Sequence, residues 1–399
     1  MKQGWPEVPL GDVIDIFDHL RVPLNATQRA ARQGPFPYYG AQGVIDHVDG
    51  YLFDGRYLLI PEDGENLNSR KLPIAYFASG RFWVNNHAHI VRGKPGVADD
   101  VFLKQWLNNA DIGPFVTGAA QPKLSQGSLK RIPVRLPPLA VQRRIASILG
   151  AYDDLIEVNR RRIAVLEEMA RRLFEEWFVH FRFPGHAGTA AAADSLPRGW
   201  RRGKLADAAA INGAAVRPAD APDRIGYIDI ASVSPGTIEN VAWMSFESAP
   251  GRARRRVKDG SVIWSMVRPN RRSFALVLDP EPDTIASTGF AVLDAKTVPM
   301  AYLYQWVTQD SFVAYLSANA TGAAYPAVTA TVFERADIVL PPADLMRRFA
   351  ALAEPQLRLA GKLKVSNSVL AGSRDLLLPR LISGDLPVAA AERELEAVA

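Results

Sequence analysis

The sequence predicts an α+β chain with two mixed α/β globular domains, each followed by a long α-helix, and the two helices packed against each other. Three observations support this prediction. Most of the chain is duplicated, each copy starts with short strand-like segments, and each copy ends in a helical stretch with apolar residues at heptad spacing.

The duplication keeps a nearly constant offset along the chain. The segment Thr117–Pro122 (TGAAQP) returns 204 residues later as Thr321–Pro326 (TGAAYP), and Gly4-Trp5 returns after 195 residues as Gly199-Trp200. The two copies therefore differ by small loop insertions, and a short-period solenoid is excluded. A chain of this kind presents two similar surfaces, which suits a ligand that is itself repetitive or two-fold.

The globular parts are predicted at residues 1–138 and 198–341, from short apolar runs separated by turn residues. In the first, Tyr51–Ile60 is interrupted by Asp-Gly and predicts a hairpin, and Asp99–Ala110 predicts a short helix. In the second, Pro299–Leu316 predicts a helical stretch with proline at its start.

Two long helices are predicted at residues 139–183 and 342–386. A linker at 184–197 joins the first helix to the second copy. The first has no proline between Gln142 and Trp177, and a helix of this length would be ~54 Å long. The second has a weaker seam, and Pro355 is expected to break or restart it. Residues 387–399 are predicted to be a flexible tail. The apolar residues at heptad positions, which we call the seam residues, include Ile156, Ile163, Leu166, Leu173, Leu363, Leu370 and Leu377.

Composition excludes several classes of protein. The chain has no cysteine, so disulfides, thiolate metal sites and cysteine nucleophiles are excluded, and a cytoplasmic location is expected. No apolar run is long enough to span a membrane. The net charge is +5 and most of the cations are arginine, but an arginine-rich proteome would give the same bias. The charge alone therefore does not identify a partner.

No catalytic or metal site is predicted. His87 and His89 lie on one face of an expected strand, but neither a cysteine nor a nearby carboxylate cluster completes a metal site, so packing or polar surface is favoured. The acidic segment Glu62–Glu65 contains Asp-Gly and is interpreted as a turn. Phosphate-binding loops, nucleophile elbows and the methyltransferase tetrapeptide around a target base are all missing.

Basic loops are the strongest functional signal, because phosphate anchoring and base recognition use arginine and lysine beside amide side chains. One such loop lies beside the first copy of the repeated TGAA segment, and a second follows an expected strand in the second copy. Scattered solvated charge is the alternative for any single residue. The candidate DNA-binding residues are Gln121, Lys123, Arg268, Asn270, Arg271 and Arg272.

An ordered set of segments resembles the DNA-specificity subunit of type I restriction–modification systems, over roughly residues 4–386. The duplication of the set makes the resemblance more specific than any single motif. The second copy lacks a counterpart of Tyr38–Gly43, which would place its domain in a different recognition subclass. The segments are Tyr38–Gly43 with Asp49–Gly55, Thr117–Ser125, Ile132–Leu139 with Gln142 and Ile145, Asn159–Ile163, and Leu377–Gly384.

The resemblance implies that the globular parts are target-recognition domains and that the helices form an antiparallel coiled coil. Each domain would recognise one half of a split target in double-stranded DNA. The helices that carry the seam residues would bind methyltransferase subunits, expected to be two, and motor-nuclease subunits would join them. The chain itself would be non-catalytic and bind no cofactor, while S-adenosylmethionine, ATP and Mg belong to its partners. The alternative is a coiled-coil scaffold whose globular ends bind other proteins.

Overall fold

The computed structural model describes residues 4–118, 120–185 and 196–396, and the chain divides into two compact units. Unit 1 comprises Met1–Glu157 and Ser368–Ala399, and unit 2 comprises Val158–Asn367. Each unit therefore combines one predicted globular domain with segments of both predicted long helices. Residues 186–195 of the predicted linker lie outside the described residues.

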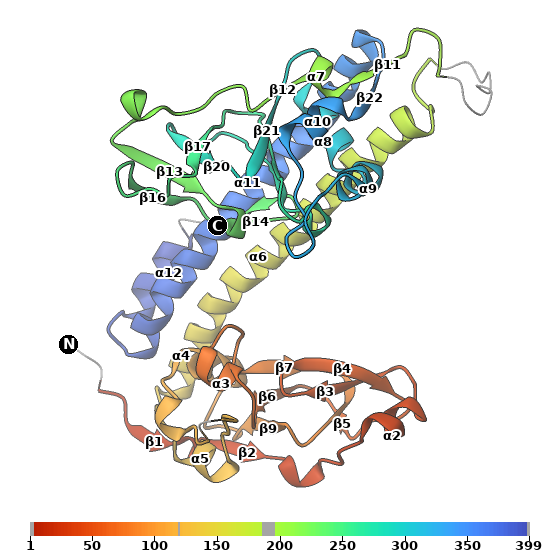
Figure 1. The fold of residues 1–399 in the computed structure, drawn as a ribbon. Coiled ribbons are helices and arrows are strands. Elements are labelled where there is room, and N and C mark those ends of the chain that lie inside the picture. The colour runs from red at the N-terminus through yellow and green to blue at the C-terminus, as the bar shows by residue number, and fades with distance from the viewer. Residues whose placement is uncertain (1–3, 119, 186–195, 397–399) are drawn as a thin grey trace. The chain divides into compact units, whose positions relative to one another are not determined.

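The globular part of unit 1 contains two four-stranded sheets, drawn in red to orange in Figure 1. Its elements are β1 (Glu7–Pro9), α1 (Leu10–Val13), β2 (Ile14–Ile16), η1 (Asp18–Leu20), α2 (Ala26–Ala30), β3 (Phe36–Gly40), β4 (Gly43–Val48), β5 (Phe53–Asp54), β6 (Tyr57–Pro61), α3 (Asn66–Ser69), β7 (Tyr76–Ala78), β8 (Arg81–Val84), β9 (Ala88–Gly93), α4 (Asp100–Asn109), η2 (Gly113–Phe115), α5 (Gln126–Arg131) and β10 (Pro133–Arg135). The strand orders are β2-β9-β6-β7 and β4-β3-β8-β5, and β1 pairs separately with β10.

The globular part of unit 2 repeats this design. Its elements are β11 (Arg201–Lys204), α7 (Leu205–Ala208), β12 (Ala209–Ile211), η4 (Pro218–Asp220), β13 (Arg224–Ile228), η5 (Ile230–Ser232), β14 (Val233–Ser234), β15 (Thr237–Ile238), β16 (Ala242–Ser245), β17 (Ala253–Arg256), β18 (Val262–Ser265), η6 (Pro269–Arg271), β19 (Phe274–Leu276), β20 (Thr284–Ser287), β21 (Phe290–Ala295), α8 (Met300–Val307), α9 (Asp310–Ala318), α10 (Ala330–Arg335) and β22 (Asp337–Leu340). The sheets have orders β12-β21-β18-β19 and β16-β13-β20-β17, with β11-β22 and β14-β15 as separate pairs.

The four-stranded sheets of the two globular parts share one topology, and unit 2 has the pair β14-β15 in addition. In unit 1, β3 pairs parallel with β8 and antiparallel with β4. In unit 2, β13 pairs parallel with β20 and antiparallel with β16. The strand β13 therefore stands where β3 stands, although no sequence motif marks it. The second copy lacks the sequence motif Tyr38–Gly43, as noted from the sequence, but strand pairing persists where the side chains have diverged.

The predicted hairpin over Tyr51–Ile60 is also wrong. Strand β5 pairs with β8, whereas β6 pairs with β7 and β9 in the other sheet. Between them Gly55 has φ +116°, a conformation that other residues adopt with strain, and there the chain passes from one sheet to the other. The predicted helix over Asp99–Ala110 is confirmed as α4, and the Asp99 carboxylate accepts from the Val101 N–H at 3.0 Å.

The two long helices are α6 (Leu139–Phe174), which ends in a π-helical turn at Glu175–Val179, and α11 (Ala343–Ile382). The expectation that Pro355 breaks the second helix is wrong. Interior proline costs ~3 kcal/mol, and here Ala353 and Leu357, both buried, anchor the helix on either side of it.

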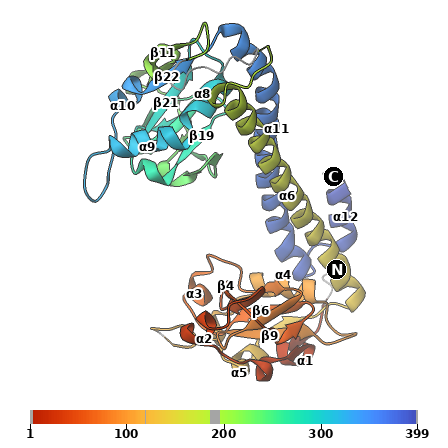
Figure 2. The ribbon, with the colours of Figure 1, turned by 90° about the vertical axis from the view of Figure 1, so that its right-hand side faces the viewer.

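Side chains of the two helices meet within each unit. In unit 2, where Figure 2 shows α6 beside α11, Asn159 Nδ2 donates to Asn367 Oδ1 at 3.0 Å and the rings of Phe174 and Phe349 lie 5.9 Å apart. In unit 1, Arg374 Nη1 donates to Asp153 Oδ1 at 2.6 Å. The helices are therefore parts of both cores.

The end of the chain departs from the predicted flexible tail. Residues Val388–Glu396 form a helix, α12, in unit 1. Leu386, Val388 and Ala391 are buried, and Arg144 pairs with Glu392 at 2.6 Å. Its alanine and glutamate content favours a helix, and Val388 and Ala391 belong to the hydrophobic core of unit 1. Among the described helices, none has the length and apolar character needed to cross a membrane.

Candidate nucleic-acid interface

The candidate DNA-binding residues of unit 1, Gln121 and Lys123, lie on a segment that hydrogen bonds join to residues 62–64. We call residues 62–64 and 120–124 the first loop pair. The N–H of Leu124 donates to the Glu62 carbonyl at 2.8 Å, and that of Gly64 donates to the Pro122 carbonyl at 3.1 Å. Thr117 and Lys123 exchange two further backbone bonds, of 2.8 and 2.7 Å. The backbone beneath Gln121 and Lys123 is therefore fixed.

Unit 2 has the same arrangement in what we call the second loop pair, residues 266–268 and 324–328. The N–H of Val328 donates to the Met266 carbonyl at 2.8 Å, and that of Arg268 donates to the Pro326 carbonyl at 2.7 Å. Thr321 and Ala327 exchange bonds of 2.9 and 2.8 Å. Residues 120–124 and 324–328 therefore occupy equivalent places in the two units, each joined to the residues that follow the equivalent strands β6 and β18.

The side chains on this shared frame differ between the units. Gln121 in the first loop pair corresponds to Tyr325 in the second, and Lys123 corresponds to Ala327. Gln121, Lys123 and Tyr325 are exposed, and Tyr325 keeps 68% of its surface accessible. Outward side chains that vary on a rigid frame are suited to recognising different ligands with one fold.

The other predicted residues of unit 2 lie on and around η6. Asn270 and Arg271 are exposed, and none of the ion pairs among the described residues includes Arg271. Arg272 pairs with Asp310 at 2.6 Å, so its charge is compensated. Tyr325 was not predicted from the sequence. The repeated hexapeptide could have indicated it, because the two copies differ only at the fifth residue, which is Gln121 in the first copy and Tyr325 in the second.

The seam residues are buried or half-buried. Ile156, Ile163, Leu370 and Leu377 are buried, while Leu166, Leu173 and Leu363 are half-buried. They belong to the chain's own packing and offer little surface to a partner. The exposed large apolar residues of α6 and α11 are others, namely Val158, Val165, Met169, Leu352, Leu359, Val365, Val369 and Leu376.

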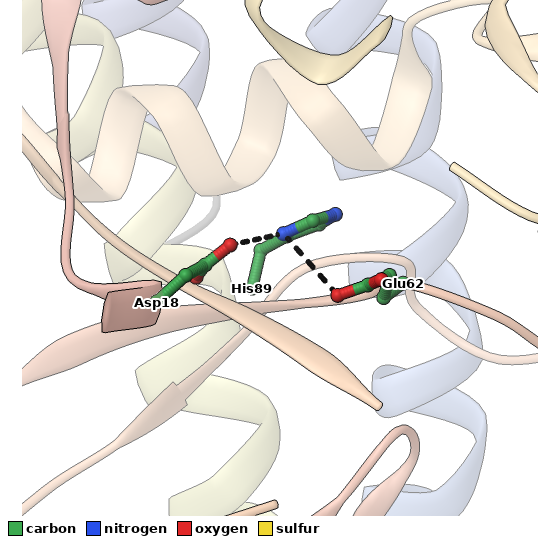
Figure 3. A group of neighbouring side chains, drawn as sticks. All are labelled: Asp18, Glu62 and His89. Carbon is green, nitrogen blue, oxygen red and sulfur yellow. Dashed lines mark hydrogen bonds and ion pairs between the residues drawn. The ribbon is translucent and has the colours of Figure 1, made fainter. Parts of the chain in front are cut away.

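Glu62 of the first loop pair forms a polar cluster with Asp18 and His89, which are buried, whereas Glu62 is half-buried (Figure 3). His89 Nδ1 lies 2.6 Å from Asp18 Oδ2, and Nε2 lies 2.7 Å from the Leu124 carbonyl. A carbonyl only accepts, so Nε2 donates to it, while Nδ1 faces the Asp18 carboxyl group. His89 therefore ties β9 directly to the first loop pair.

The charges around this cluster balance each other. Burial by itself raises the pKa of the Asp18 carboxyl, but the hydrogen bond and charge of His89, the Ile90 N–H and Arg21 lower that pKa below its ordinary value. Arg21 also donates to Glu62 at 2.9 Å, and Lys123 Nζ lies 3.4 Å from the same carboxylate.

The cluster contradicts the expectation that no carboxylates lie near His89, because the fold joins residues far apart in the sequence. With both ring nitrogens engaged in hydrogen bonds, a metal ion would have to displace existing partners. By strand register and loop hydrogen bonds, Ala291 and Met266 of unit 2 are equivalent to His89 and Glu62 of unit 1. The polar cluster of Asp18, Glu62 and His89 therefore has no equivalent at these positions of unit 2.

Comparison with known proteins identifies the relationship. A family model described as type I restriction modification DNA specificity domain matches residues 2–168. The chain is a relative of the type I specificity subunits. A putative specificity subunit of Haemophilus influenzae is 39% identical over 148 residues, a match that spans only 37% of each chain. The MjaIX specificity subunit of Methanocaldococcus jannaschii is 24% identical over 344 residues, 82% of this chain and 78% of that one.

The fold is shared with a specificity subunit of known structure. The type I restriction–modification S subunit from M. genitalium superposes with a TM-score of 0.65, covering 94% of this chain and 96% of that one, at 13% identity. The resemblance predicted from the sequence to the type I specificity subunits is confirmed, and the mixed α/β architecture with it.

Proposed function

We propose that the chain is the DNA-specificity subunit of a type I restriction–modification complex and performs no chemistry itself. Each unit recognises one half of a bipartite, asymmetric target in double-stranded DNA. The observation that carries this proposal is that the first and second loop pairs have equivalent backbone hydrogen bonds and different exposed side chains. Two different recognition domains on one chain suit two different half-sites, whereas a homodimer presents two identical domains.

In this proposal α6 and α11 form an antiparallel coiled coil that separates the two recognition domains. Support comes from the contacts within unit 2, where residue numbers rise along α6 from Asn159 to Phe174 while their partners on α11 fall from Asn367 to Phe349. A helix ~54 Å long is sufficient to separate two modules by about one turn of duplex, ~34–36 Å.

The same helices bind the partner subunits, namely two methyltransferase subunits, which motor-nuclease subunits then join. Val158, Val165 and Met169 are exposed on α6 at spacings of seven and four residues, so they share one helix face within unit 2. We assign the methyltransferase contact to this face in place of the seam residues first expected to mark it, because those are covered.

The chemistry and its cofactors belong to the partners. S-adenosylmethionine, ATP and Mg bind the methyltransferase and motor-nuclease subunits, and this chain binds none of them. The complex acts on the DNA of its own cell, in the cytoplasm.

Mapping methylated adenines in host DNA tests the proposal. With the chain present, we expect methylation at one split sequence, and deleting the chain removes that methylation while the methyltransferase subunit is still expressed. Methylation that persists at the same sequence without the chain would contradict the proposal.

A protein-binding scaffold is the competing function, and salt dependence separates the two. If loop cations neutralise phosphates, the affinity of the assembled complex for DNA falls steeply as salt rises, with a slope of ~−0.9 per phosphate contact. A scaffold would show no sequence-specific DNA binding at any salt concentration.

A further inference from the structure

Arg268 and Tyr325 form a stacked pair on the outer surface of the second loop pair. The guanidinium carbon lies 4.3 Å from the centre of the tyrosine ring, and Nη2 donates to the Ala324 carbonyl at 3.0 Å. The arginine is half-buried, whereas the tyrosine keeps 68% of its surface exposed. The ring and the carbonyl together hold the guanidinium plane in one orientation.

Arg268 differs from Arg272 and Arg252 in having no carboxylate partner within the described part of the chain, and like Arg272 it has a positive φ. Arg272 pairs with Asp310, and Arg252 pairs with Asp229, but none of the ion pairs found among the described residues involves Arg268. Its φ of +50° is one that side chains other than glycine adopt at a cost. An oriented cation without a carboxylate partner, held in a strained loop, is available for a ligand outside the chain.

We propose that Arg268, held in plane by Tyr325, recognises a guanine in the half-site bound by unit 2. The proposal rests on the proposed DNA-specificity function. The planar guanidinium can donate two parallel hydrogen bonds, and the major-groove edge of guanine offers the O6 and N7 acceptors that match them. Only one of its N–H groups is used by Ala324, so a donor pair remains.

The equivalent positions of unit 1 carry different chemistry. Gly64 stands in place of Arg268 and Gln121 in place of Tyr325, so the first loop pair has no stacked guanidinium. An amide side chain matches the N6 and N7 edge of adenine better than guanine. The two loop pairs therefore recognise unlike bases from the same backbone positions.

The test uses the complete methyltransferase complex and its mapped target. Four variants are compared with wild type, Arg268→Ala, Arg268→Lys, Tyr325→Ala and Tyr325→Phe, and Arg201→Ala serves as the matched control. Arg201 is also an exposed arginine of unit 2, at the start of β11. Binding is measured on the target and on duplexes in which each guanine of the unit 2 half-site is replaced by 7-deazaguanine, which lacks N7.

At one guanine we expect Arg268→Ala and Arg268→Lys each to reduce discrimination against the substituted duplex by about 5-fold to 150-fold. Tyr325→Ala should reduce it as well, Tyr325→Phe should keep it because the ring remains, and Arg201→Ala should match wild type. Thermal unfolding of each variant shows that the loss is not a folding defect.

Three results would overturn the inference. One is a unit 2 half-site without any guanine, and another is unchanged discrimination in Arg268→Ala. The third is an equal loss of affinity for all sequences with a salt slope smaller by ~1, which indicates a phosphate contact. In each case a wild-type complex that remains sequence-specific leaves the proposed function intact. A wild-type complex that binds no specific sequence would remove both.

Discussion

Arg268 occupies in unit 2 the backbone position that Gly64 occupies in unit 1. The N–H of Arg268 donates to the Pro326 carbonyl, and the N–H of Gly64 donates to the Pro122 carbonyl. Both residues have positive φ, +50° and +116°. Glycine adopts such a backbone without strain, whereas arginine does not. Arg268 therefore adopts a strained backbone at the place where its side chain stacks on Tyr325 and donates to the Ala324 carbonyl.

Replacing Gly64 by alanine should destabilise unit 1 by about 1–3 kcal/mol. A Cβ at Gly64 meets no atom within 4 Å, so the cost comes from the backbone conformation alone. Gly127→Ala is the matched control, because Gly127 lies inside helix α5 and should gain about 0.5–1 kcal/mol. Thermal unfolding measures both, and a loss in Gly127→Ala equal to that in Gly64→Ala would contradict this explanation.

His89→Ala should destabilise the chain by about 3–5 kcal/mol, since the Asp18 carboxylate is then buried without its main partner. The neighbouring His87 provides the control. Its ring pairs with Asp63 at 2.7 Å but is 48% exposed, so His87→Ala should cost less than about 1 kcal/mol. Denaturant unfolding compares the two variants, and equal losses would show that the buried cluster has no special role.

The pH dependence of stability should include the contribution of Asp18. Its pKa in the folded chain lies below its ordinary value of 3.8, so the carboxylate stabilises the fold above that pH. The contribution is lost as the pH falls through the folded pKa. Wild type should therefore exceed Asp18→Asn in unfolding free energy at pH 6, and the difference should shrink below pH 4.

The control for this pH series is Asp12→Asn, which removes an exposed carboxyl from the same unit. Its unfolding free energy should follow wild type throughout. A difference between wild type and Asp18→Asn that stays constant from pH 6 to pH 3 would be inconsistent with a hydrogen-bonded carboxylate at position 18.

Charges on the exposed face of α6 should weaken subunit assembly and leave the fold intact. Val165 and Met169 are 58% and 50% exposed, so Val165→Asp with Met169→Asp leaves no charge in the core. We expect methyltransferase binding at least about tenfold weaker. Leu20→Asp, at an exposed apolar residue of unit 1, is the control. Binding of the double variant equal to that of the control would place the contact elsewhere.

Regular patterns in the sequence predicted the regular parts of the fold. The apolar period over Gln142–Trp177 predicted α6, and Asp99 before an apolar helical pattern predicted α4. Pro355 misled the prediction because a local rule was outweighed by burial on both sides of it. Strand partners could not be predicted either, since β5 and β6 follow each other in the chain and enter different sheets.

The candidate site was only partly accessible from the sequence. Gln121 and Lys123 stood out beside a repeated segment, and Arg268 stood out by its charge. Nothing in the sequence indicated that Arg268 and Tyr325 meet, because 57 positions separate them and only the loop hydrogen bonds bring them together. The Asp18 and His89 contact was hidden for the same reason, at a separation of 71 residues.

The central claim is that each unit recognises its own half of one split DNA sequence. Replacing residues 1–138 by the corresponding part of another specificity subunit, and then mapping methylated adenines in host DNA, tests this most directly. The account predicts that one half-site changes while the other half-site and the gap stay the same. A change in both halves, or in neither, would contradict it.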